Sequence, residues 1–238
     1  MRLTTLGRAA VAAAAVLLAP AAGPAQVALN QVDTFEGGTT QGWTQGAGAP
    51  VGSLVVATGG PAGPADHFLQ VTARGGFGAG SRLTTFNQAQ WTGDYNAAGV
   101  TMIELDFRAP TSNPQALSMR IGFRDAIGSG YVSNAFTVPA DGVWRHAVFH
   151  LTNAEFTPVG GPSASLSDFL SSVPEMRILH ATAPTLNGGD PIAAVVGIDN
   201  IKASFTPVPE PASVLAVAAV VTVAARPLLR RRASARPG

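Results

Sequence analysis

Two carboxylates two positions apart are the residues of this chain best placed to act as catalytic groups. Glu104 and Asp106 lie in a segment of alternating apolar and polar residues, so both side chains are expected on one face of a β-strand. Paired carboxyl groups about 5 Å apart can cleave a glycosidic bond as nucleophile and general acid. Retaining hydrolysis needs a second carboxyl group at that distance, and it is missing locally, because positions 108 and 109 are arginine and alanine. We therefore predict no catalytic residue here and interpret the face as a charged surface, paired with Arg120 and Arg124 on the next strand.

His146 and His150 have a spacing that brings two metal ligands together on a helix. The surrounding segment alternates like a strand, on which four residues extend about 13 Å, too far for one ion. His67 and His180 stand alone, and the chain has no cysteine. We therefore expect neither a histidine metal site nor disulfide or thiol chemistry.

Asp199 is a carboxylate on an apolar strand face. Strict alternation from position 195 to 205 puts Asp199 on the same face as Val195, Gly197 and Ile201. A carboxylate in such surroundings must be hydrogen-bonded, paired or bound to a metal. The sequence leaves open a hydrogen bond to loop amides, a buried arginine partner, and a calcium ion.

Four large aromatic residues have rings broad enough to stack on a sugar. We expect Trp43 and Trp144 in the core, because each lies within a segment that a β-framework would bury. Trp91 and Tyr95 lie in a polar, glycine-containing stretch, residues 88–97, and are our candidate ligand-binding pair.

The elements that must position these residues are mostly short strands. Period-two patterns and turn signals predict an all-β sandwich over residues 30–206, with one short helix at 165–170. Strands are expected at residues 32–36, 53–57, 67–73, 101–108, 118–125, 131–138, 144–151, 177–180 and 193–205. The turn signal at residues 110–114 predicts that the strands at 101–108 and 118–125 form a hairpin.

The framework resembles the jelly roll of carbohydrate-binding modules. The similarity lies in Phe35-Glu36-Gly37, in Gly42-Trp43, in Trp144 and in the closing segment 197–201, Gly-Ile-Asp-Asn-Ile. Residues 90–95 also resemble the laminin B domain, another sandwich. The resemblance to the modules implies a structural calcium held by Glu36 and Asp199, with carbonyl oxygens from the glycine-rich loop after Glu36. It also implies carbohydrate binding, without naming the sugar.

The charge of the chain is unevenly distributed. The whole chain has 15 Lys and Arg against 14 Asp and Glu, but seven of the arginines and one glutamate lie in the two ends. Residues 26–208 therefore contain 8 basic and 13 acidic residues, a net charge of −5. We expect no nucleic-acid partner for such a surface.

The N-terminal 25 residues have the pattern of a signal peptide. Arg2 and Arg8 form a basic start, residues 9–19 are apolar, and small residues precede an expected cleavage after Ala25. The chain is therefore predicted to be exported.

The C-terminal segment, residues 207–238, has three parts. Pro209-Glu210-Pro211 precedes an apolar segment, 212–229, which is interrupted only by Arg226 and Pro227 and is followed by an arginine cluster at Arg230, Arg231, Arg232 and Arg236. Eighteen helical residues span about 27 Å, enough for a thin bilayer, and the arginines favour a cytoplasmic end. The segment resembles the PEP-CTERM sorting signal of Gram-negative bacteria, which implies processing by a membrane-embedded exosortase.

Together these patterns predict an exported, non-catalytic protein, first anchored in the inner membrane by its tail and then placed at the cell surface or in the extracellular matrix. Two alternatives remain: a carbohydrate-binding module and a polysaccharide-cleaving enzyme. Extracellular polysaccharide is the expected partner of the first alternative.

Overall fold

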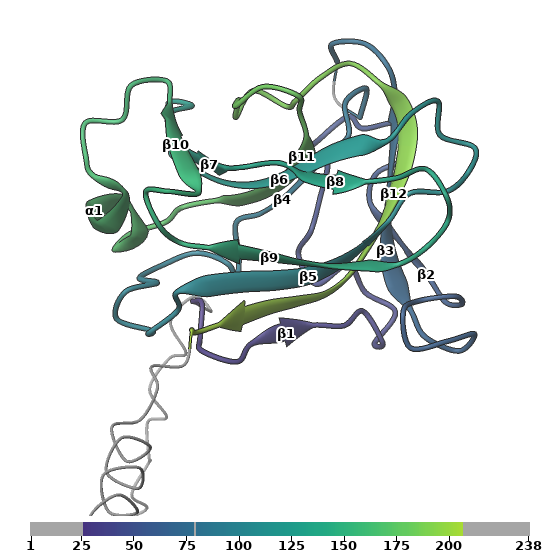
Figure 1. Ribbon diagram of the computed structural model, residues 1–238, viewed down its shortest axis with the longest axis horizontal. Helices are drawn as coiled ribbons and strands as arrows, with labels where there is room; N and C mark the ends of the chain where they lie inside the picture. The colour runs from purple at the N-terminus through teal and green to yellow at the C-terminus, as the bar shows by residue number, and fades with distance from the viewer. Residues whose placement is uncertain (1–25, 79, 207–238) are drawn as a thin grey trace, which may run out of the picture.

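The computed structural model describes residues 26–78 and 80–206, which form two antiparallel β-sheets packed face to face (Figure 1). Sheet A has the order β2-β3-β12-β5-β9, and β1 also pairs with β12; sheet B has the order β10-β7-β6-β11-β4, and β8 also pairs with β6. The strands of sheet A are β1 (Val32–Asp33), β2 (Leu54–Val56), β3 (Phe68–Arg74), β5 (Met102–Arg108), β9 (Arg145–His150) and β12 (Ala193–Ser204). Those of sheet B are β4 (Thr84–Asn87), β6 (Leu117–Arg124), β7 (Gly130–Ser133), β8 (Phe136–Val138), β10 (Phe156–Val159) and β11 (Met176–His180). The expected all-β sandwich is confirmed.

The core lies between the sheets and is built from the apolar faces that the alternation predicts. Ile103, Leu105 and Phe107 of β5 are completely buried, as are Ile121 and Phe123 of β6. Each such side chain contributes about 1.5–3 kcal/mol when it leaves water, so these faces determine which side of each strand points inward.

The expected hairpin between the strands at 101–108 and 118–125 is wrong. β5 pairs with β12 and β9 in sheet A, whereas β6 pairs with β7, β8 and β11 in sheet B. The turn residues therefore carry the chain from one sheet to the other. Asn113 holds this connection on β12, donating to the Val195 carbonyl at 2.7 Å and accepting its N–H at 2.9 Å. The sequence could not separate pairing from packing, because facing sheets and paired strands both turn apolar residues to the same core.

The face of the sheet expected for Asp199 is wrong, because β12 contains a β-bulge. The register against β5 shifts between Asp199 and Lys202, where Asn200 has a φ of 50°. The extra residue reverses the alternation, so Ile201 enters the core while Asp199 and Lys202 both lie on the outer face of sheet A. Asp199 therefore does not share a face with Ile201.

The described helix is α1 (Leu166–Leu170), with Ser165 as its N-cap, as expected. Within residues 26–78 and 80–206, no helix has the length and apolar character needed to cross a bilayer. The expected signal peptide, residues 1–25, and the sorting tail, residues 207–238 with Pro209, Glu210, Pro211 and the arginine cluster, lie outside the described residues.

Candidate functional site

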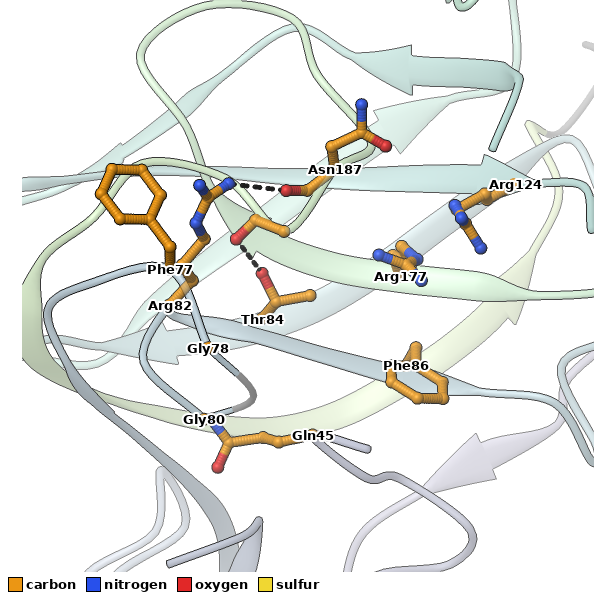
Figure 2. Close-up of a pocket in the computed structure, with 11 residues that line it drawn as sticks. Gln45, Phe77, Gly78, Gly80, Arg82, Thr84, Phe86, Arg124, Arg177 and Asn187 are labelled. Atoms are coloured by element: carbon orange, nitrogen blue, oxygen red, sulfur yellow. Dashed lines mark hydrogen bonds between the residues drawn. The ribbon is translucent and has the colours of Figure 1, made fainter. Parts of the chain in front are cut away.

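An open cleft of about 500 Å³ lies on the outer face of sheet B (Figure 2). Its floor comes from three neighbouring strands, β4, β11 and β6, and its walls come from the loops before β4 and after β11. The principal side chains are those of Gln45, Phe77, Arg82, Thr84, Phe86, Arg124, Arg177 and Asn187.

The cleft exists because a loop covers only part of this sheet face. Phe86, Arg177 and Gly122 form a row across β4, β11 and β6. A Cβ on Gly122 would lie 2.5 Å from Leu186 Cδ2, so glycine lets the loop after β11 lie against the sheet. Leu186 joins a small second apolar cluster there with Val132, Leu179 and Ala181. The part of the face that carries Phe86 and Arg177 remains uncovered.

Arg177 is fixed above the ring of Phe86. Its guanidinium carbon lies 5.3 Å from the ring centroid, and its Nη1 donates to the Leu186 carbonyl at 2.9 Å. Its Nε forms an ion pair with the buried Glu175, which also accepts from Gln88 at 2.8 Å. These contacts pre-organise Arg177 and Phe86 as a flat, cationic platform.

Arg82 joins the two walls of the cleft. Its Nη1 donates to the Asn187 carbonyl at 2.7 Å, drawn in Figure 2, and to the Gly189 carbonyl at 2.9 Å. Its guanidinium lies 5.0 Å from the ring of Phe77, a phenylalanine that is 83% exposed. An exposed ring held by an arginine at the rim of a cleft is a surface available for a ligand.

Two groups in the cleft have unused hydrogen-bonding capacity. The buried Nε of Arg124 and the buried Oε1 of Gln45 have no hydrogen-bond partner among the described residues. Figure 2 places Arg124 beside Arg177, on the side of the cleft opposite Phe77. None of the lining residues is acidic. The arginine side chains that line the cleft can donate hydrogen bonds, the amide side chains of Gln45 and Asn187 can donate and accept, and Phe77 and Phe86 contribute apolar surface.

The expected ligand-binding pair, Trp91 and Tyr95, is wrong as a surface platform. Both side chains are completely buried, so neither ring can stack on a sugar. Trp91 Nε1 donates to Asp33 Oδ2 at 2.6 Å, and the Tyr95 hydroxyl donates to the Trp91 carbonyl at 2.9 Å. The stretch appeared polar because its other side chains face outward, whereas these two rings fill the core.

Of the other two tryptophans, Trp43 lies in the core as expected, whereas Trp144 is half-buried. Trp144 packs edge-on against Phe68, with ring centroids 5.3 Å apart, and donates from Nε1 to the Gly59 carbonyl at 2.9 Å.

Glu104 and Asp106 lie on the outer face of sheet A, away from the cleft. His146 bridges them, with Nε2 3.3 Å from Glu104 and Nδ1 3.0 Å from Asp106, and Lys202 lies 3.5 Å from Glu104. The expected partners Arg120 and Arg124 are wrong, because they belong to the other sheet. Hydrogen bonds and charges from Ser204, Lys202 and His146 lower the pKa of Glu104 despite partial burial.

His146 and His150 do not share a ligand. His150 Nδ1 contacts Glu155 at 2.7 Å instead. The two histidines thus enter separate pairs with acids.

Asp199 is surrounded by other acids. It is completely buried; its Oδ1 accepts the Asn200 N–H at 2.7 Å, but Oδ2 has no hydrogen-bond partner among the described residues. Burial raises the pKa of Asp199 to about 7 against the effect of that N–H, and repulsion from Asp66, Asp106 and Glu36 adds to the shift.

The residues around Asp199 fit a cation only in part. Within the described residues no three His, Cys, Asp or Glu side chains form a ready-made metal site. Glu36 Oε1 already accepts the His67 N–H at 3.0 Å, and Asp66 Oδ2 accepts the Ala62 N–H at 2.6 Å. The orphaned oxygen and the crowded negative charge favour a bound cation, and calcium takes carbonyl oxygens that such a side-chain count omits.

The residues that line the cleft could hardly be predicted from the sequence. Arg82 and Phe86, Arg124, and Arg177 come from three separate segments and meet only through the strand order of sheet B. The one local signal was Phe77, an aromatic residue within a glycine-rich stretch, where nothing nearby can bury it.

No protein-family model matches the chain, and no curated protein matches it. Among solved structures, it is similar to a family 11 carbohydrate-binding module from Clostridium thermocellum in complex with a mixed-linked tetrasaccharide, at 16% identity and a TM-score of 0.48, over 76% of this chain and 97% of that one. It is also similar to the CBM22-1 xylan-binding domain of Paenibacillus barcinonensis, at 15% identity and a TM-score of 0.43, over 76% of this chain and 99% of that one. An exo-beta-agarase matches at 10% identity and a TM-score of 0.48, over 76% of this chain and 25% of that one. These likenesses concern the sandwich fold, and the ligand must be argued from the chain's own side chains.

Proposed function

We propose that this chain is an exported, non-catalytic glycan-binding protein, and that the cleft on sheet B holds the sugar. The observation that carries the proposal is the combination, in one open cleft, of two ring faces with unused polar groups. Phe77 and Phe86 offer apolar surfaces to the C–H groups of a sugar. Gln45, Asn187 and the arginines offer hydrogen bonds to its hydroxyls.

A binding role suits this cleft better than hydrolysis. Cleavage of a glycosidic bond needs two carboxyl groups on either side of it, and the lining contains none. Glu104 and Asp106, the pair of acids that the sequence singles out, are held by His146 on the other sheet.

The test is isothermal titration of the full chain with soluble polysaccharides, both neutral and acidic. A shallow site of this kind is expected to bind with a dissociation constant near 1 mM, about −4 kcal/mol. Phe77→Ala should weaken binding, whereas Phe205→Ala, which removes another exposed phenylalanine outside the cleft, should not. Equal binding by both variants, or no binding to any polysaccharide, would contradict the proposal. Release of reducing ends would favour the polysaccharide-cleaving alternative.

We also propose a structural calcium ion at Asp199, with Glu36 as a second carboxylate ligand and backbone carbonyls completing the sphere. The unpartnered Asp199 Oδ2 and the surrounding acids support it. A calcium ion that binds only the folded state stabilises that state by about 2.7 kcal/mol when the calcium concentration is a hundredfold above the dissociation constant. EDTA should therefore lower the melting temperature by several degrees, and Asp199→Asn should abolish the response. A melting temperature indifferent to both EDTA and added calcium would rule the ion out.

Finally, we propose that export depends on residues 1–25 and that the tail places the protein at the cell envelope through an exosortase-type enzyme. The basic and apolar pattern of residues 1–25 and the Pro209-Glu210-Pro211 tail support this. Intact-mass measurement of protein from the cell surface should show loss of the C-terminal arginines. Recovery of surface protein that retains Arg236 would refute processing.

A further inference from the structure

The cleft has the opposite charge to the rest of the molecule. Residues 26–208 contain 8 basic and 13 acidic residues, yet three of those basic residues line one cleft that has no acidic lining residue. A general excess of arginine cannot explain this, because arginine is scarce outside the chain ends. The positive charge is therefore a local property of the site.

Most of this charge is not neutralised by the protein. The ion pairs found among the described residues include Arg177, with Glu175, but neither Arg82 nor Arg124. Arg82 donates to carbonyl oxygens, which satisfy its N–H groups without cancelling its charge. The Arg124 guanidinium likewise has no acidic partner within the described part of the chain, and its buried Nε has no acceptor there.

Building on the proposed function of this cleft, we propose that its ligand is an acidic polysaccharide with carboxylate groups on its sugars. Arg124 binds one carboxylate, and Arg82, at the other end of the cleft, contributes a second positive charge (Figure 2). A guanidinium presents two parallel N–H donors that match the two oxygens of a carboxylate. Phe77, beside Arg82, and Phe86, beside Arg177, contact the sugar rings.

The same features disfavour other polyanions. A nucleic acid must approach along a surface much larger than this cleft, and the net charge of −5 over residues 26–208 repels it. An extended glycan places a charge on each sugar and an apolar ring face between charges. That repeat suits a cleft in which each phenylalanine ring lies beside a guanidinium group.

The experiment compares polygalacturonate with its fully methyl-esterified form, which has the same backbone without the charge. Calorimetric titration of the full chain should show binding to polygalacturonate at least tenfold tighter than to the ester, and weaker binding as salt is added. Arg124→Gln should weaken polygalacturonate binding by about tenfold, because a hydrogen-bonded charge pair is lost. Arg145→Gln removes the same charge from sheet A and should leave binding unchanged.

Other results of these titrations would contradict either the acidic ligand alone or glycan binding as a whole. Equal binding to polygalacturonate and the ester overturns the acidic ligand but leaves glycan binding intact, whereas no binding to either, or to any neutral polysaccharide, overturns both. Equal effects of Arg124→Gln and Arg145→Gln would show that the acid binds outside the cleft. Tighter binding to dextran sulfate, or to a single-stranded oligonucleotide, than to polygalacturonate would overturn the choice of a carboxylated glycan.

Discussion

Asp33 is the buried residue on which the aromatic core depends most directly. Its Oδ2 accepts from Trp43 Nε1 at 2.7 Å, Trp91 Nε1 at 2.6 Å and Gln90 Nε2 at 3.1 Å. Burial raises the pKa of Asp33, and these three N–H donors act in the opposite direction. One carboxylate thus satisfies two indoles whose rings lie 6.2 Å apart.

Replacing Asp33 with alanine should destabilise the fold strongly. Two buried indole N–H groups would lose their acceptor, at about 1–3 kcal/mol each, so we expect the free energy of unfolding measured in urea to fall by about 2–6 kcal/mol. Asp33→Asn keeps an oxygen acceptor and should lose less. Asp141→Ala, at an exposed aspartate, serves as the surface control. If Asp33→Ala were as stable as Asp141→Ala, the hydrogen bonds to Asp33 would not contribute to the stability of the fold.

His180 should make stability depend on pH. It is buried, and its Nδ1 accepts the Ser118 N–H at 2.9 Å, which requires the neutral ring. Burial lowers the pKa of His180 below its usual 6.5. Between the folded pKa and 6.5 the unfolded chain binds more protons, so stability is full above about pH 6.5 and falls as the pH drops through that window.

The control for this prediction is His180→Asn, whose side-chain oxygen can accept the same N–H without titrating. Urea unfolding at pH 7.5 and 5.5 should show a larger loss on acidification in the original chain than in the variant. Equal losses in both chains would assign the pH dependence to other groups.

At the scale of elements, Trp144 links β9, at the edge of sheet A, to β12 in its centre through packing contacts. From just before β9 its ring reaches across β5 to Gly197 of β12, where a Cβ would lie 2.9 Å from Trp144 Cη2 and 3.2 Å from Phe68. Only glycine allows this approach.

Gly197→Ala should therefore displace the Trp144 ring. We expect tryptophan emission to shift to longer wavelength and stability to fall by about 1–3 kcal/mol, the usual cost of overpacking. Gly37→Ala, at a glycine where an added methyl group would meet nothing within 4 Å, should change neither. Unchanged emission in Gly197→Ala would mean that the ring does not rest on β12.

The same scale shows where sequence reasoning succeeds and fails. Alternation located β5, β6 and β12 to within a residue or two, because period two reflects which face is buried. It missed β4 and β10, which have only four residues each. Alternation does not show which strands pair with one another. The sheet-B cleft is formed by three strands that are distant in sequence, so it cannot be predicted from the alternation. Trp91 and Tyr95 were misplaced for a related reason, since local polarity does not report contacts with Asp33 or the core.

At the scale of the whole molecule, the loops at the Arg82 end of the cleft lie away from the two ends of the described chain. The loops that flank the cleft adjoin the start of β12, where Ala193 pairs with Arg74, whereas Thr206 follows the end of that strand. Twelve strand residues span about 40 Å. In Figure 1 the described chain begins and ends at the same side, away from those loops. A molecule tethered at its C-terminal end would therefore present the loop-flanked end of the cleft away from the tether.

This arrangement predicts that the tail can be removed without loss of fold or binding. The last described contact is the Thr206 N–H donating to Thr101 Oγ1 at 3.0 Å, and the core residues of the described chain extend no further than Ala203. A chain ending at residue 206 should melt within a degree or two of the full chain and bind the same polysaccharides. In cells it should appear in the medium, whereas the full chain should first be found at the envelope. A melting temperature lowered by several degrees would show that residues after 206 belong to the sandwich, and retention of the shortened chain at the envelope would place the anchor elsewhere.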